Sequence, residues 1–232
     1  MARAASPSFH TAQAVIWDVD GTLADSTDLG FTSTNAVLVE ASLPAITRAQ
    51  YLLGTRYPTP ERLAWHATGD VDDASGPVLG AAFDRHYVRL VSASTAGFYP
   101  GIGEIVDAIA AHPAGKAQAV LSNACGAYAR AVLETNGRLA AMAHVHGADD
   151  APRPKPHPDG LLAQCDASGW DPARCVYVGD SPSDGIAARA AGMMSVGVAW
   201  GAHDRDALAA EGRFDAVVMD ARELRRLLLG EE

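Results

Sequence analysis

The sequence has 232 residues, a formal net charge of −10 at pH 7 and a mean hydropathy of +0.01. It is long enough for one large domain, or for a main domain with a smaller second one. The negative charge, without a local basic stretch, argues against nucleic acid and anionic membranes as partners. It is still compatible with an anionic substrate, because a bound divalent cation can reverse the charge of an acidic cluster.

Cysteine spacing and hydropathy indicate the cellular compartment in which the protein is expected. The three cysteines, Cys125, Cys165 and Cys175, form no CxxC pattern, so we expect neither a disulfide framework nor a zinc site. Residues 1–13 lack the apolar core of a signal peptide, and no segment reaches the length of a membrane span. We therefore expect a protein of the reducing cytoplasm, neither secreted nor inserted in a membrane.

The first predicted element is a buried strand that ends at two carboxylates. The run Ala14–Trp17 is apolar without alternation, as is typical of a parallel strand buried on both faces. Asp18 and Asp20 follow directly, and Gly21 permits a sharp turn after them.

The next seventy residues have a helical pattern. Apolar residues recur at three- and four-residue spacing between helix breakers, which predicts helices at 27–42, 48–53, 60–68 and 78–93. A single crossover between parallel strands needs only about a dozen residues. We therefore interpret residues 26–96 as an inserted helical domain, the alternative being helices that flank the sheet.

From Tyr99-Pro100-Gly101 onward, predicted helices and strands alternate. The strands are expected at 117–121, 143–146, 175–178, 195–198 and 216–218, and the helices at 102–112, 127–136, 158–167, 183–191, 204–211 and 221–229. This alternation predicts an α/β fold with a Rossmann-like parallel sheet covered by helices on both faces. The predicted core domain comprises residues 1–25 and 97–232.

Polar side chains follow several of the predicted strands. They are Asp18 and Asp20, then Ser122 and Asn123, then Lys155 in the loop RPKPHP, and finally Asp180 and Asp184 in GDSPSD. Because parallel strands end at one edge of a sheet, these groups can converge on one pocket. So many carboxylates repel one another unless a cation lies among them, and Mg²⁺ fits a site of few protein oxygens plus a substrate phosphate.

The stretches DVDGTLADS, LSNA, RPKPHPDG and VGDSPSD, in this order, resemble the four motifs of the haloacid dehalogenase superfamily. The chain is most similar to its phosphoglycolate-phosphatase-like branch, which has a helical cap inserted after the first motif. The resemblance extends from about residue 14 to residue 201. It implies a phosphatase that acts on a small phosphorylated metabolite and uses Mg²⁺.

The resemblance also implies a role for each motif residue. Asp18 is expected to attack phosphorus and form an aspartyl-phosphate, and Asp20 to act as general acid and base. Ser122, Asn123 and Lys155 are expected to bind the phosphoryl group. The metal ligands are expected to be Asp18, Asp20 through its backbone carbonyl, Asp180, and Asp184 either directly or through a water.

Some of these residues have simpler interpretations. Asp20 could be only a turn residue, and Asp184 or the pair Ser122-Asn123 only a helix cap. Lys155 is the least easily explained in this way, because the chain has only two lysines beside sixteen arginines. A lysine between two prolines, in a chain that otherwise uses arginine, indicates that this position requires a compact positive charge.

The inserted helices are expected to select the substrate. Arg56, in LLGTRYPTPERL, is the candidate for a substrate carboxylate or second phosphate, because its guanidinium suits such groups. The alternative is an exposed surface charge. The insert has no lysine for Schiff-base chemistry, and the presence of Asp20 argues against a dehalogenase.

Three other functions stay open at this point. A phosphosugar mutase of the β-phosphoglucomutase type could share the catalytic residues. A phospho-aspartate receiver domain shares the chemical groups, but not the long insert or the Asp18-x-Asp20 pair. A catalytically silent regulator is the third. The sequence leaves the oligomeric state unknown.

Overall fold

The computed structural model describes residues 8–113 and 115–230. Residues 1–7, 114 and 231–232 of the predicted core domain lie outside the described residues. Within the described ranges, no helix is both long and apolar enough to cross a lipid bilayer.

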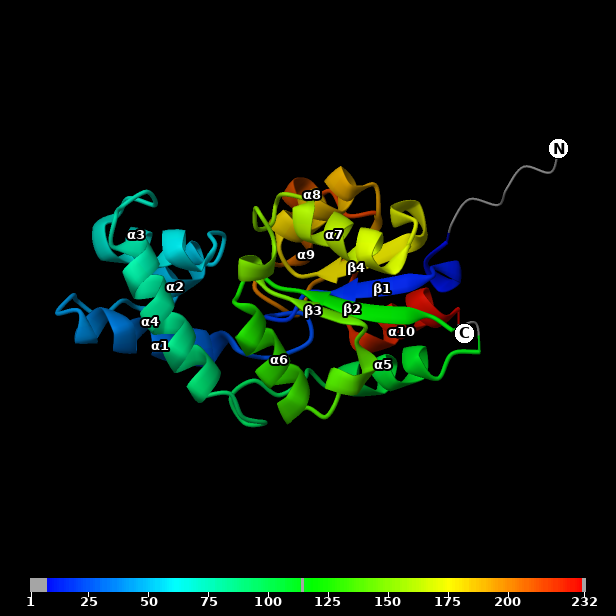
Figure 1. Ribbon diagram of the computed structural model, residues 1–232, viewed down its shortest axis with the longest axis horizontal. Helices are drawn as coiled ribbons and strands as arrows, with labels where there is room; N and C mark the ends of the chain where they lie inside the picture. The colour runs from blue at the N-terminus through cyan, green and yellow to red at the C-terminus, as the bar shows by residue number, and fades with distance from the viewer. Residues whose placement is uncertain (1–7, 114, 231–232) are drawn as a thin grey trace.

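A six-stranded parallel sheet forms the centre of the larger lobe (Figure 1). Its order is β3-β2-β1-β4-β5-β6, with β1 at Ala14–Trp17, β2 at Ala117–Leu121, β3 at His144–His146, β4 at Cys175–Gly179, β5 at Met194–Val198 and β6 at Ala216–Val218. Trp17, the last residue of β1, lies beside Val120 of β2 and Val178 of β4. The neighbouring strands therefore end together at one edge, and the predicted α/β fold class is confirmed.

Helices cover both faces of the sheet because side chains alternate along each strand. Val15 and Trp17 join one apolar cluster with α5 (Ile102–Ala110), α6 (Gly126–Thr135) and α10 (Ala221–Leu229). Ala14 and Ile16 join a second cluster with α7 (Asp159–Ser168) and α8 (Pro182–Ala191). Figure 1 shows these two groups of helices on opposite sides of the sheet.

The smaller lobe consists of helices that lie between β1 and α5 in the sequence, and we call it the cap lobe. Its helices are α1 at Thr27–Glu40, α2 at Arg48–Gly54, α3 at Thr59–Thr68 and α4 at Gly76–Arg89. Figure 1 shows it beside the sheet rather than wrapped over a sheet face. All four predicted helices are present, whereas the independence of residues 26–96 as a domain stays a prediction.

Both chain segments that connect the lobes run side by side. Ala24, on the way out, forms an antiparallel bridge with Phe98, on the way back. The backbone N–H of Asp25 donates to the carbonyl of Gly97 at 2.9 Å. The two covalent connections between the lobes therefore lie at a single place.

Two predicted helices differ from the structure by more than two residues at one end. The helix predicted at 78–93 ends at Arg89, because the hydroxyl of Thr95 accepts from the backbone N–H of Ser92 at 2.9 Å and stabilises a turn in its place. The helix predicted at 204–211 is one short turn, α9 at Arg205–Ala207, followed by wider turns over Leu208–Gly212. There the carbonyl of Gly212 packs so close to Gly185 of α8 that a Cβ on Gly185 would lie 1.9 Å from it.

Candidate active site

The predicted motif residues meet at the carboxyl edge of the sheet. Asp18 directly follows β1, and its backbone N–H continues the sheet by donating to the carbonyl of Val178 at 2.9 Å. Ser122 directly follows β2, and Asp180 directly follows β4. One cavity is lined by all of the motif residues, namely Asp18, Asp20, Ser122, Asn123, Lys155, Asp180 and Asp184.

Lys155 lies at the centre of this cluster and is only 4% exposed. Its Nζ donates to Oδ1 of Asp18 at 2.7 Å and to Oδ1 of Asp184 at 2.7 Å. A third partner is the hydroxyl of Tyr177 at 2.8 Å, which itself donates to the carbonyl of Leu121 at 2.9 Å. The ammonium is therefore fixed between two carboxylates and a phenol.

Burial and charge shift the ionisation of these groups. Burial raises the pKa of Asp18 to about 7, even though the charge of Lys155 acts to lower it. Burial, together with the charges of Asp18 and Asp184, raises the pKa of Asp180 well above its ordinary value. Although burial opposes it, the two carboxylates raise the pKa of Lys155, so the ammonium stays charged.

Asn123 holds the loop that presents Lys155. Its side-chain amide donates to the backbone carbonyl of Lys155 at 3.0 Å, and its carbonyl accepts from the backbone N–H of Lys155 at 2.9 Å. The neighbouring Ser122 is 1% exposed, and its Oγ accepts from the backbone N–H of Ala124 at 3.0 Å. Its hydroxyl hydrogen is thus left to donate elsewhere in the cavity.

Asp184 is interpreted from the sequence either as a metal ligand or as a helix cap, and its placement is compatible with both. Its Oδ1 contacts Lys155, and its Oδ2 accepts from the backbone N–H of Ser181 at 3.0 Å, at the start of α8. The side chain therefore caps the helix and faces the site at the same time.

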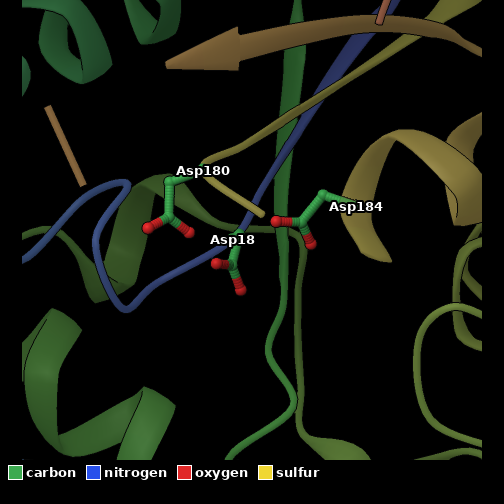
Figure 2. A group of neighbouring side chains, drawn as sticks. All are labelled: Asp18, Asp180 and Asp184. Atoms are coloured by element: carbon green, nitrogen blue, oxygen red, sulfur yellow. The ribbon is translucent and has the colours of Figure 1, made fainter. Parts of the chain in front are cut away.

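Three buried carboxylates form a possible metal site. Figure 2 shows Asp18, Asp180 and Asp184 turned toward one another, and one ligand oxygen from each lies within 4.8 Å of the others. Lys155 supplies a single positive charge against these three carboxylates. Hard oxygen donors with an excess of negative charge suit a divalent cation such as Mg²⁺, so the residues present fit the expected metal.

The backbone approaches Asp180 from two sides. A Cβ on Gly21 would lie 2.0 Å from its Oδ2, and a Cβ on Gly201 would lie 2.2 Å from the same atom. The backbone N–H of Ala202 donates to this oxygen at 2.6 Å. Glycine is required at both positions because any side chain would displace the carboxylate.

Asp20 is held by hydroxyl groups of both lobes. Its Oδ1 accepts from Ser26 at 2.5 Å, from Tyr87 of α4 at 2.6 Å and from Tyr128 of α6 at 2.6 Å. Sequence reasoning missed both tyrosines, which lie 67 and 108 residues from Asp20. No local pattern marks them.

The cap lobe supplies an arginine to the cavity, but not the predicted one. Arg56 is exposed, does not line the cavity and donates through Nε to the carbonyl of Leu53 at 3.0 Å. Its substrate role stays a prediction without support from this placement. Arg62 of α3 does line the cavity, and its guanidinium carbon lies 4.6 Å from the centroid of the Phe83 ring.

Arg62 has spare hydrogen-bonding capacity. Its Nε is buried without a hydrogen-bond partner, and in the described part of the chain no carboxylate lies within 4.0 Å of its guanidinium. The aromatic rings of Phe83 and Tyr51, the latter at 5.7 Å, fix its position. The sequence offered one signal, an arginine six residues after Arg56 on the next predicted helix.

A buried ammonium and three buried carboxylates lie together at the carboxyl edge of a parallel sheet, the place where α/β enzymes bind their ligands. A model of the family described as haloacid dehalogenase-like hydrolase matches residues 15–198. The chain belongs to this family and is a hydrolase.

Individual relatives agree with the family. The chain is 34% identical over 189 residues to a phosphoglycolate phosphatase of Xanthomonas campestris, with 82% of this chain and 84% of the relative covered. It shares its fold with a variant of CbbY from Rhodobacter sphaeroides, solved in complex with xylulose-(1,5)bisphosphate. That match has a TM-score of 0.75 and 22% identity, and it covers 92% of this chain and 96% of the other. A predicted phosphoglycolate phosphatase from Haemophilus somnus has a TM-score of 0.77 at 23% identity, with 92% of this chain and 96% of the other covered.

Proposed function

We propose that this protein is a Mg²⁺-dependent phosphatase that hydrolyses a small phosphomonoester through an aspartyl-phosphate on Asp18. The observation that carries the proposal is the contact between Asp18 and Lys155 beside two further buried carboxylates. The membership in the family and the names of the curated relatives support it. The proposed cellular setting is the cytoplasm, in keeping with the three free cysteines.

In the proposed reaction, an oxygen of Asp18 attacks phosphorus and the bond from phosphorus to the ester oxygen breaks. Asp20 gives its proton to the departing alkoxide, and then takes a proton from the water that attacks the phosphorus of the aspartyl-phosphate. The second step restores the carboxylate of Asp18 and releases inorganic phosphate. Lys155 and the hydroxyl of Ser122 stabilise the charge on the transferring group.

The acidic cluster is proposed to hold the metal. Asp18, Asp180 and Asp184 supply its side-chain oxygens, and the backbone carbonyl of Asp20 stays a predicted ligand. A bound Mg²⁺ neutralises negative charge on the phosphoryl oxygens and on the carboxylates.

We propose that the substrate carries a second anionic group, as phosphoglycolate does. The cavity is small, about 110 Å³, and it extends from the acidic cluster to Arg62 of the cap lobe. An arginine without a carboxylate partner suits a substrate carboxylate or second phosphate. Arg62 thus takes the place of Arg56 as the candidate for selecting the substrate.

Metal dependence gives the direct test of the proposed activity. The purified protein is expected to release phosphate from p-nitrophenyl phosphate and faster from 2-phosphoglycolate when Mg²⁺ is present. Chelation with EDTA is expected to remove both activities, and added Mg²⁺ to restore them, because the carboxylate cluster cannot bind the phosphoryl group unaided. Metal-independent release, or no release from a panel of metabolites, would overturn the proposal.

The same panel tests the role of Arg62. Arg62→Met is expected to raise KM for 2-phosphoglycolate by about 10-fold or more, because a charged hydrogen bond is lost. It is expected to change KM for p-nitrophenyl phosphate by less than about threefold, since that ester has no second anion. Arg56→Met is the matched control and is expected to leave both values unchanged. Equal losses on both substrates would show that Arg62 only stabilises the cap lobe.

Two alternatives are separated by the fate of the phosphoryl group. A mutase of the β-phosphoglucomutase type needs a sugar phosphate as acceptor and transfers the group to it instead of to water. A receiver domain retains phospho-aspartate for hours, whereas the proposed enzyme turns it over in seconds or less. The Asp20 carboxylate beside Asp18 favours rapid turnover.

A further inference from the structure

Two tyrosines of different lobes meet at one oxygen of Asp20. Tyr87 comes from α4 of the cap lobe and Tyr128 from α6 of the sheet lobe. Their rings are stacked, with centroids 3.8 Å apart and planes 13° from parallel. Tyr87 is 4% exposed and Tyr128 is fully buried, so both hydroxyls are fixed by packing as well as by the carboxylate.

Both phenols donate to this carboxylate, because an ionised carboxylate offers only acceptor atoms. With Ser26 added, three hydroxyl groups donate to Oδ1. Three donors more than fill the two lone pairs of Oδ1, which leaves Oδ2 as the oxygen for proton transfer.

We propose that Tyr87 and Tyr128 are positioning residues that orient Asp20 for proton transfer through Oδ2, and that they do so only when α4 lies against α6. The inference rests on the proposed function, because it assigns the orientation of the carboxylate that serves as acid and base there. The contacts themselves, in which Tyr87 of the cap lobe and Tyr128 of the sheet lobe together hold Asp20, do not depend on the substrate. We call this pair of contacts the clamp. The cap lobe thereby contributes to the protonation step as well as to the cavity wall.

The proposal predicts an effect that depends on the leaving group. An alkoxide needs a proton as it departs, whereas p-nitrophenolate leaves readily without one. A misplaced acid therefore slows the hydrolysis of alkyl esters selectively. The ratio kcat/KM is the suitable measure because it reports events up to the departure of the leaving group.

The experiment compares Tyr87→Phe, Tyr128→Phe and the double variant with the unchanged protein, using 2-phosphoglycolate and p-nitrophenyl phosphate. Each single variant is expected to lower kcat/KM about 10-fold for the alkyl ester and less than about threefold for the aryl ester. The double variant is expected to lose less than the product of the two single losses, because both hydroxyls hold one oxygen. Tyr99→Phe, which removes a tyrosine hydroxyl outside the cavity, is the control and is expected to match the unchanged protein.

Thermal unfolding supplies a readout that does not require activity. Each Tyr→Phe change is expected to lower Tm by about 2–4 °C when Asp20 is present, which is the size of effect expected for the loss of one hydrogen bond. When Asp20→Ala is also present, the same change is expected to lower Tm by less than about 1 °C, because the hydroxyl then has no carboxylate to bind. Equal losses of kcat/KM on both esters, or a Tm loss independent of Asp20, would overturn the positioning role. If the unchanged protein releases phosphate from neither ester and from no metabolite of the panel, the proposed function fails. The unfolding measurements still decide whether the clamp exists, that is, whether the two tyrosines hold Asp20.

Discussion

Replacing Asp18 with asparagine is expected to abolish turnover, with kcat reduced by about 10⁴-fold or more. The amide is a poor nucleophile and cannot form the proposed aspartyl-phosphate. Its size matches the carboxylate, so the contacts around β1 and β4 are kept. The measurement is phosphate release at saturating substrate and Mg²⁺, with circular dichroism to verify the fold.

The same variant is expected to be more stable than the unchanged protein when metal is removed. The folded-state pKa of Asp18, about 7, lies above the ordinary 3.8, so folding favours the protonated form. The stability contributed by that form is complete below the unfolded pKa and is lost as pH rises through about 7. The gain in Tm from Asp18→Asn should therefore grow between about pH 4 and pH 7 and then level off. A gain that is largest at low pH would contradict this account of the site.

Replacing Lys155 with methionine is expected to lower kcat by about 10²–10³-fold. The change removes the only positive charge that contacts Asp18 and Asp184 in the described residues. It is also expected to reduce the free energy of unfolding by about 3–5 kcal/mol, because two buried carboxylates lose their counter-charge. Steady-state kinetics and urea unfolding measure the two effects.

The other lysine of the chain provides a matched control. Lys116 is 6% exposed and its Nζ donates to the backbone carbonyl of Leu228. It directly precedes β2, at the opposite end of the strand from Ser122. Lys116→Met is expected to reduce stability while leaving kcat unchanged. A similar loss of kcat in both variants would show that the effect of Lys155→Met arises from unfolding.

The motif residues could be located from the sequence because each directly follows a predicted strand or lies in a loop after one, and because parallel strands end at one edge of the sheet. Asp18, Ser122 and Asp180 each follow an apolar run, and parallel strands bring such positions to one edge. Tyr87, Tyr128 and Arg62 could not be located in this way. Their roles depend on how the cap lobe lies against the sheet lobe, which no spacing along the chain records.

The errors in the element boundaries have local causes. The apolar spacing continues past Arg89, so the sequence predicts a helix as far as residue 93. In the structure the helix ends at Arg89, and hydrogen bonds between Ser92 and Thr95 form a turn after it. The turns over Leu208–Gly212 follow from the close approach of Gly212 to Gly185, a tertiary contact. The contact of the Tyr177 hydroxyl with Lys155 was not predicted, because a tyrosine within a buried strand has the same sequence pattern as an apolar core residue.

The two chain connections between the lobes lie side by side at Ala24 and Phe98. Two attachments at separate places would restrict the cap lobe to small sliding movements, whereas a single double-stranded attachment allows rotation about one axis. Because the chain leaves and re-enters at the same point, a short linker from Ala24 to Phe98 could replace the whole cap lobe without straining the sheet. Such a replacement would keep the strands and the acidic cluster, whereas the contacts that the cap lobe makes with the site, such as the hydrogen bond from Tyr87 to Asp20, would be lost.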